Sequence, residues 1–188
     1  NQLLPAQVAI RSCAVVGDEF DVRANIEKTY AYVFSTSPCR NPLTRLHAWH
    51  VPRRRGRPAW DEMAAASLME RMQGAHSFSA FGNTPRGKER LVPVDPNCEL
   101  MQLTLAPSPT GDDPDAWTIT VRGDRFLYKM VRNLVGAIVR VGSGELSSDE
   151  VLEALASGAF ARSASVPLTA PAHGLCLRHV AYEENPFS

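Results

Sequence analysis

The sequence of 188 residues lacks several features that define large classes of proteins. Its formal net charge is +0, so no overall electrostatic attraction to nucleic acid or membrane is expected, although a local basic cleft stays compatible with neutrality. No run is long and apolar enough to span a bilayer. With 44% hydrophobic and 21% charged residues, the composition is that of an ordinary globular domain with a sizeable core.

The cysteines and histidines lack the spacings of a disulfide framework or a metal site. The four cysteines are far apart and form no Cys-x-x-Cys pair: Cys13, Cys39, Cys98 and Cys176. They predict reduced, partly buried thiols in an intracellular protein, without distinguishing cytoplasm, nucleus and organelle. His47 and His50 lie in a proline-flanked loop without nearby carboxylates, so no metal site is expected there.

Alternating apolar residues predict several strands, at 7–16, 27–37, 98–106, 116–123 and 175–183. The third and fourth are joined by an acidic turn and predict a hairpin. A long connection over 37–58 contains the only concentrated basic run, "RRRGR" (53–57), for which a solvated loop is favoured over a phosphate contact. The segment 75–97 is expected to be irregular.

Two further segments have the signals of capped helices. Over 58–74, Pro58 and Asp61 stand near the start and Gly74 just past the end. Its predicted buried side is Met63, Leu68, Met69 and Met72. A later helix is capped by Ser147 or Ser148, with Asp149 and Glu150 in its first turn. The order of elements predicts an α+β fold with an antiparallel or mixed sheet and helices packed on one face.

The stretch "FLYKMVRNLVGAIVRVGSGELS" (126–147) combines a broad apolar helix face with features that do not suit a core helix. It carries three cations, Lys129, Arg132 and Arg140, and a glycine, Gly136, that costs about 1 kcal/mol relative to alanine in mid-helix. On a helical wheel Tyr128 and Arg132 fall just beyond the border of the apolar face. An arginine there can bury its stem and present its guanidinium to a cleft. Gly136 would then permit close approach of sheet or helix backbone.

Six segments, in order, carry a family resemblance: "NQLLP" (1–5), "FDVR" (20–23), "KTYAY" (28–32), "GAHSFSAF" (74–81), "FLYKMVRNLVGAIVRVGSG" (126–144) and "APAHGLCLRHVAY" (170–182). Together they resemble the second half of the tRNA pseudouridine synthase A (TruA-type) family. Ser77 stands where that family usually has an aspartate. The resemblance implies a C-terminal α+β domain of the pseudouridine synthase fold, in which 1–36 contributes strands to the central sheet and 37–188 forms one continuous domain.

The resemblance also implies site residues for isomerising uridine to pseudouridine in tRNA. Arg132 would pair with the catalytic aspartate, and Tyr30 would stack on the flipped base. Arg23, Lys28 and Tyr128 are expected to contact substrate, with a surface salt bridge as the equal alternative for Arg23. Tyr32 is more simply a core aromatic, and His76 and Phe78 are expected to pack. No metal or organic cofactor is called for.

One part of the family pattern does not occur in the sequence, namely the Gly-Arg-Thr-Asp-x-Gly-Val-His type loop that carries the catalytic aspartate. The chain also begins without methionine, so we expect a C-terminal piece that is inactive alone, lacks its N-terminal half and leaves a sheet face or strand edge uncovered. Its implied partners are tRNA, that half and a second copy in a homodimer, with no membrane. Alternatives are a non-catalytic RNA-binding module and an unrelated α+β domain.

Overall fold

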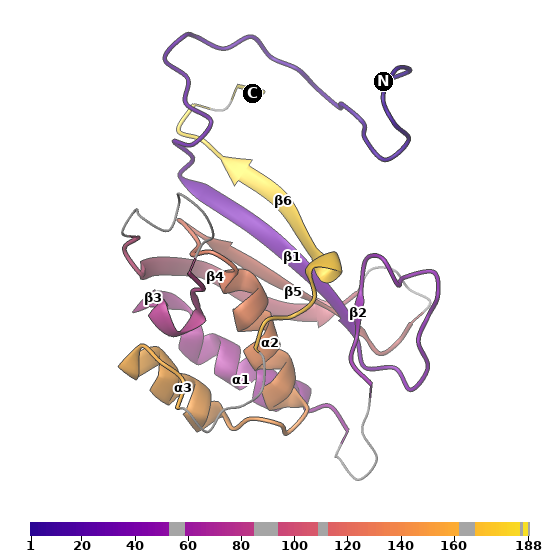
Figure 1. Cartoon of the computed structure of the whole chain (residues 1–188), viewed down its shortest axis with the longest axis vertical. Coiled ribbons are helices and arrows are strands. Elements are labelled where there is room, and N and C mark those ends of the chain that lie inside the picture. Colours follow the sequence, from indigo (N-terminus) through magenta and orange to yellow (C-terminus); the bar gives the residue numbers. More distant parts are fainter. Residues whose placement is uncertain (53–58, 85–93, 109–112, 162–167, 185, 188) are drawn as a thin grey trace.

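The computed structural model describes residues 1–52, 59–84, 94–108, 113–161, 168–184, 186 and 187. Six strands form one mixed sheet in the order β2-β1-β5-β4-β3, and β6 also pairs with β1. Figure 1 shows β6 alongside β1, the helices gathered beside the sheet, and the N-terminal segment running away from it. The predicted α+β class with a mixed sheet is confirmed.

Most of the sheet is antiparallel. The strands are β1 (Glu27–Ser35), β2 (Trp49–His50), β3 (Gly74–Ser77), β4 (Asn97–Pro107), β5 (Ala116–Gly123) and β6 (Leu175–Ala181). Among the strand pairs of the described residues, only β1–β2 is parallel. The predicted hairpin is β4–β5, although part of its acidic turn lies outside the described residues. The sequence did not reveal β2, which is too short for an alternation, or β3, which falls in the segment expected to be irregular.

Helices α1 (Glu62–Met72) and α3 (Ser148–Ser157) begin at the capping residues that the sequence indicated. The Asp61 carboxylate accepts from Ala64 N at 2.9 Å, and Ser147 forms a reciprocal capping box with Glu150. The buried side of α1 is Ala65, Leu68, Met69 and Met72. The prediction for Met63 was wrong: it is 82% exposed, because it lies two residues before Ala65 and so projects from another side of the helix.

Helix α2 (Met130–Gly142) is the central core element, yet it begins later than its apolar pattern suggests. Lys129 adopts a left-handed backbone with φ 62°, and this conformation separates the helix from residues 126–128. Tyr128 therefore precedes the helix, and its placement on a helical wheel was wrong. Within α2, only Arg132 and Arg140 are not fully buried.

The core lies between α2 and the sheet face that carries the β1 aromatics. Tyr32 and Phe34 are fully buried there, opposite Ile119 and Trp117 of β5. Phe78, which was expected to pack, is fully buried, and so is Phe81; the His76 ring meets that of Phe78 with centroids 5.8 Å apart. Burying a large apolar side chain of this kind contributes about 1.5–3 kcal/mol each, so this face supplies much of the driving force for folding.

The first 26 residues form no strand, contrary to the prediction for 7–16. No described strand pairs with residues 7–16, and an isolated strand leaves its backbone hydrogen bonds unmade. Val8, Ile10 and Val15 are 52%, 57% and 101% exposed, so the alternation does not correspond to a buried face. Within 1–36, β1 alone contributes to the sheet, and the proposed division of the chain at residue 36 stays a prediction.

Three further predictions concerned the cysteines, the basic run and membrane-spanning segments. Of the four free thiols only Cys98 is buried, so the prediction of partly buried thiols was wrong for Cys13, Cys39 and Cys176. The basic run 53–57 and Pro58 lie outside the described residues. Among the helices that are described, none has the length and apolarity to cross a bilayer.

Candidate functional site

Arg132 lies on α2 against a segment of extended chain, residues 168–171, that leads into β6. Its Nε donates to the Ala170 carbonyl oxygen at 2.6 Å, and the Ala170 backbone N donates to the Arg132 carbonyl at 3.1 Å. Among the described residues, Arg132 has no carboxylate partner. One edge of the guanidinium is thus held by backbone, and the two terminal nitrogens stay available to an anion.

Gly136, one turn further along α2, explains the mid-helix glycine. A Cβ at this position would overlap the carbonyl oxygen of Leu168. The glycine therefore admits the backbone of the 168–171 segment directly onto the helix. The sequence predicted a close approach of sheet or helix backbone. That detail was wrong, because the approaching backbone belongs to neither a strand nor a helix.

Tyr30 lies in the middle of β1, on the same face as Tyr32. Its ring meets that of Phe126 edge to face, with centroids 5.2 Å apart and planes at 90°. The ring is partly buried, and burial raises the pKa of its hydroxyl above the ordinary value. An aromatic ring held by a second ring but not fully enclosed is suited to stacking on a planar base.

Tyr32 connects the β1 face to the surroundings of Arg132. Its hydroxyl donates to the Pro171 carbonyl at 2.7 Å, and its side chain is fully buried. Burial raises the pKa of this hydroxyl strongly, and the nearby positive charge of Arg132 offsets part of the increase. Tyr32, which is the expected core aromatic, shares one face of β1 with Tyr30 and lies close to Arg132, so Tyr30 and Arg132 are on the same side of the sheet.

The remaining predicted site residues, Lys28, Tyr128 and Arg23, lie in three different parts of the structure. Lys28 is half-buried on β1, two residues before Tyr30 and facing the same side. Tyr128 precedes α2 and is 43% exposed, with its carbonyl accepting from Asn83 N at 2.9 Å. Arg23 lies apart, in the N-terminal segment.

Arg23 forms the surface salt bridge that was the alternative expectation. Its Nη2 lies 3.0 Å from Asp21 Oδ2, and its side chain is 87% exposed. The pair lowers the pKa of the Asp21 carboxyl and raises that of the guanidinium, chiefly through the side-chain hydrogen bonds between them. Such an exposed pair organises a local turn, and Arg23 itself lines no described pocket.

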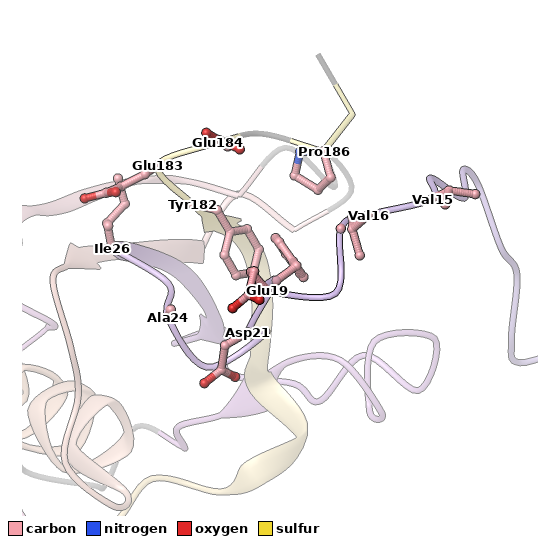
Figure 2. Close-up of a pocket in the computed structure, with 12 residues that line it drawn as sticks. Val15, Val16, Glu19, Asp21, Ala24, Ile26, Tyr182, Glu183, Glu184 and Pro186 are labelled. Carbon is pink, nitrogen blue, oxygen red and sulfur yellow. The ribbon is translucent and has the colours of Figure 1, made fainter.

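A separate concavity of about 610 Å³ lies between the N-terminal segment and the chain after β6 (Figure 2). Its lining combines apolar side chains with four carboxylates, those of Glu19, Asp21, Glu183 and Glu184. Phe20 and Tyr182 pack there with ring centroids 5.1 Å apart. Among its described lining residues there is no cation and none of the predicted site residues, so it is not suited to phosphate.

Sequence reasoning missed three contributors to the site: Phe126, Asn133 and the 168–171 segment. Phe126 was read as a core position of a helix that in fact starts four residues later. Asn133 is a polar residue in an apolar helix, a signal that could have marked it as a buried hydrogen-bonding group. The 168–171 segment has no local pattern that reveals where it lies.

Comparison with known proteins agrees with the resemblance. The family model described as tRNA pseudouridine synthase matches residues 68–183. The chain is 35% identical over 184 residues to tRNA pseudouridine synthase A of Syntrophotalea carbinolica, covering 97% of the chain and 66% of that protein.

The proteins of the same name from Roseiflexus castenholzii and Myxococcus xanthus are 32% and 35% identical, with 98% and 99% of the chain matched. The match spans 63% and 64% of these relatives, so the chain spans about two thirds of their length. The family model covers Arg132, the 168–171 segment and β6, whereas the matches to the relatives extend over nearly the whole chain. On this evidence the chain belongs to the tRNA pseudouridine synthase family.

Proposed function

We propose that this chain contributes one wall of the active site of an enzyme that isomerises uridine to pseudouridine in tRNA. The observation that carries the proposal is the placement of Tyr30 and Arg132 on one face of the sheet, with the terminal nitrogens of Arg132 unpaired among the described residues. Family membership supplies the reaction class.

Two roles follow from the chemistry. The target base must leave the helical stack, and Tyr30 would hold it by stacking, an interaction of about 1–3 kcal/mol per base. Arg132 would bind the catalytic carboxylate through its terminal nitrogens, keeping the acid ionised and oriented towards the sugar. Lys28 and Tyr128 would contact the RNA backbone or the base from the same side.

The relatives are about one and a half times as long as this chain. The catalytic carboxylate would come from the part of such a longer enzyme that this chain does not include. In this proposal that part covers the outer edge of β6, which among the described strands pairs only with β1 and leaves Leu177 48% exposed. It would also cover the apolar N-terminal segment and the concavity in Figure 2, whose carboxylates suit protein better than RNA. A homodimer and an intracellular location remain expectations.

The test compares the 188-residue chain alone with the same chain joined to the segment that carries the aspartate loop. Both are incubated with unmodified tRNA, and pseudouridine is measured by mass spectrometry. We expect product from the longer protein only, and loss of product when Tyr30→Ala is introduced but not Tyr182→Ala. Product from the short chain contradicts the assignment of the carboxylate. Salt-dependent tRNA binding by both proteins without product would instead support the RNA-binding module.

A further inference from the structure

The side chain of Asn133 is buried and fully hydrogen-bonded at the point where three segments meet. It is 4% exposed. Its Nδ2 donates to the Phe81 carbonyl and to Asn83 Oδ1, both at 2.6 Å, and its Oδ1 accepts from Thr169 Oγ1 at 2.7 Å. Because the Phe81 carbonyl can only accept, the amide nitrogen must face it, which leaves the amide oxygen for the Thr169 hydroxyl. This orientation of the amide satisfies all three bonds.

One of these bonds acts on the segment that holds Arg132. Thr169 precedes Ala170, whose backbone exchanges two hydrogen bonds with Arg132. The hydroxyl bond from Thr169 to Asn133 therefore fixes the same segment at the next residue of α2. The close contact at Gly136 and the bond from Tyr32 to Pro171 secure it further.

The other two bonds act on the opposite side of the helix start. The Phe81–Asn83 segment also donates from Asn83 N to the Tyr128 carbonyl at 2.9 Å. A single amide thus links the backbone that orients Arg132 to the backbone that carries Tyr128. Both of these residues are candidates for contact with substrate or with the catalytic carboxylate.

We infer that Asn133 is a positioning residue: through Thr169 it holds the 168–171 segment so that the Arg132 guanidinium keeps the orientation needed to bind a carboxylate. The expected effect on catalysis rests on the proposed function. The expected effect on the orientation of Arg132 does not. It predicts that loosening the Thr169 bond frees Arg132 without removing any charged or stacking group. Binding of RNA would then persist while the chemical step slows.

The structural readout is the solvent-exchange rate of the Arg132 Nε proton, measured by NMR on the 188-residue chain. Thr169→Val keeps the shape of the side chain and removes the hydroxyl, and we expect exchange to become about tenfold faster, the scale of losing one hydrogen bond. Thr169→Ser retains the hydroxyl and should restore the slow rate. Ser79→Ala, which removes a hydroxyl bond to the Gly158 carbonyl, is the control for a general loss of stability. An unchanged rate in Thr169→Val, or an equal increase in Ser79→Ala, overturns the inference.

The catalytic readout uses the longer, active protein. We expect Thr169→Val to lower kcat by about tenfold with KM unchanged, and Thr169→Ser to leave both near the parent values. A raised KM with unchanged kcat contradicts a role through Arg132. If the parent protein forms no pseudouridine, the proposed function fails, and the proton-exchange result still decides whether Asn133 positions Arg132. Asn133→Ala is a harsher second variant, since it removes all three bonds.

Discussion

The two arginines of α2 occupy similar half-buried positions on the same core helix but have different surroundings. At the C-terminal end, Arg140 Nε lies 3.7 Å from Glu145 Oε2, and the two side chains are 14% and 20% exposed. At the N-terminal end, Arg132 is held by a backbone carbonyl and has no carboxylate partner among the described residues. Arg140 thus forms a local ion pair, whereas Arg132 is held in place without a carboxylate partner among the described residues.

This difference supports the proposed contrast between a structural charge at Arg140 and a functional one at Arg132. A partly buried cation is costly unless it is paired, so a fold that positions one without a partner leaves it for something else to pair with. The neighbouring features support the contrast, because Gly136, Asn133 and Tyr32 all secure the segment beside Arg132. Arg140 instead donates from Nη1 to the Gly136 carbonyl at 3.4 Å, on its own helix, and lies beside the Glu145 carboxylate.

The largest expected difference is in catalysis. In the longer, active protein, Arg132→Ala should lower kcat by about 100- to 1,000-fold, the scale of removing one group that stabilises charge in an active site. Arg140→Ala should leave kcat within about twofold while lowering the free energy of unfolding by about 1–2 kcal/mol. Steady-state kinetics gives kcat and urea unfolding gives the free energy of unfolding for both variants. An equal loss of kcat in the two variants would contradict different roles for Arg132 and Arg140.

The next largest effect concerns the glycine beside Arg132. Gly136→Ala places a Cβ against the Leu168 carbonyl, so the 168–171 segment must move, with an expected loss of about 1–3 kcal/mol of stability. Gly17→Ala, where no atom lies within 4 Å of the new Cβ, is the matched control and should be neutral. Thermal unfolding measures both. Stability of Gly136→Ala equal to the parent would show that the segment is not held against the helix.

A smaller effect is expected at Tyr32, and it depends on pH. Tyr32→Phe removes the bond to Pro171 and should cost about 1 kcal/mol at neutral pH. Burial raises the pKa of Tyr32 in the folded state above the unfolded value of about 10, so the parent loses stability as pH rises above 10, where only the unfolded chain ionises. The variant should lose less over that range. Unfolding free energies at pH 8 and pH 11 test this, and identical slopes for the two proteins would contradict it.

The smallest effect is expected for Lys129→Gly, at the left-handed backbone where α2 starts. Lys129→Gly should change stability by no more than about 1 kcal/mol, because glycine tolerates φ 62° but loses more entropy on folding. Lys129→Val should destabilise by more than that, since a β-branched residue is strained there. Denaturant midpoints of the two variants compare them directly. The opposite ranking would show that Lys129 does not hold this backbone in solution.

Local sequence patterns predicted a strand correctly where a neighbouring strand pairs with it, and a helix start correctly where a capping residue precedes it. β1, the β4–β5 hairpin and the capped starts of α1 and α3 all follow from alternation and capping residues, whose physics acts within a few residues. The same reasoning failed for 7–16, where the alternation is present but no neighbouring strand is. It also failed at Met63, because a helical face is defined by what packs on it and not only by the apolar residues that it carries.

The candidate site was predicted in part. Tyr30 and Arg132 were identified through the family resemblance, and no composition or periodicity alone would have paired them. Arg23 was left between two roles, and in the structure it forms an exposed ion pair with Asp21. Phe126, Asn133 and the 168–171 segment escaped notice because their importance depends on contacts between residues far apart in the chain, such as the bond between Asn133 and Phe81.

The sequence by itself determined the α+β class, the helix caps and the apolar faces, because these depend on residues close together in the chain. It also determined the family, because the family motifs occur in order along the chain. Only the tertiary structure decided which of two arginines on one helix stays without a carboxylate partner among the described residues. It did so by bringing the backbone of residues 168–171 onto Gly136 and Arg132, across 38 positions of sequence between Arg132 and Ala170. Contacts over such separations depend on how the elements pack, which no local pattern specifies.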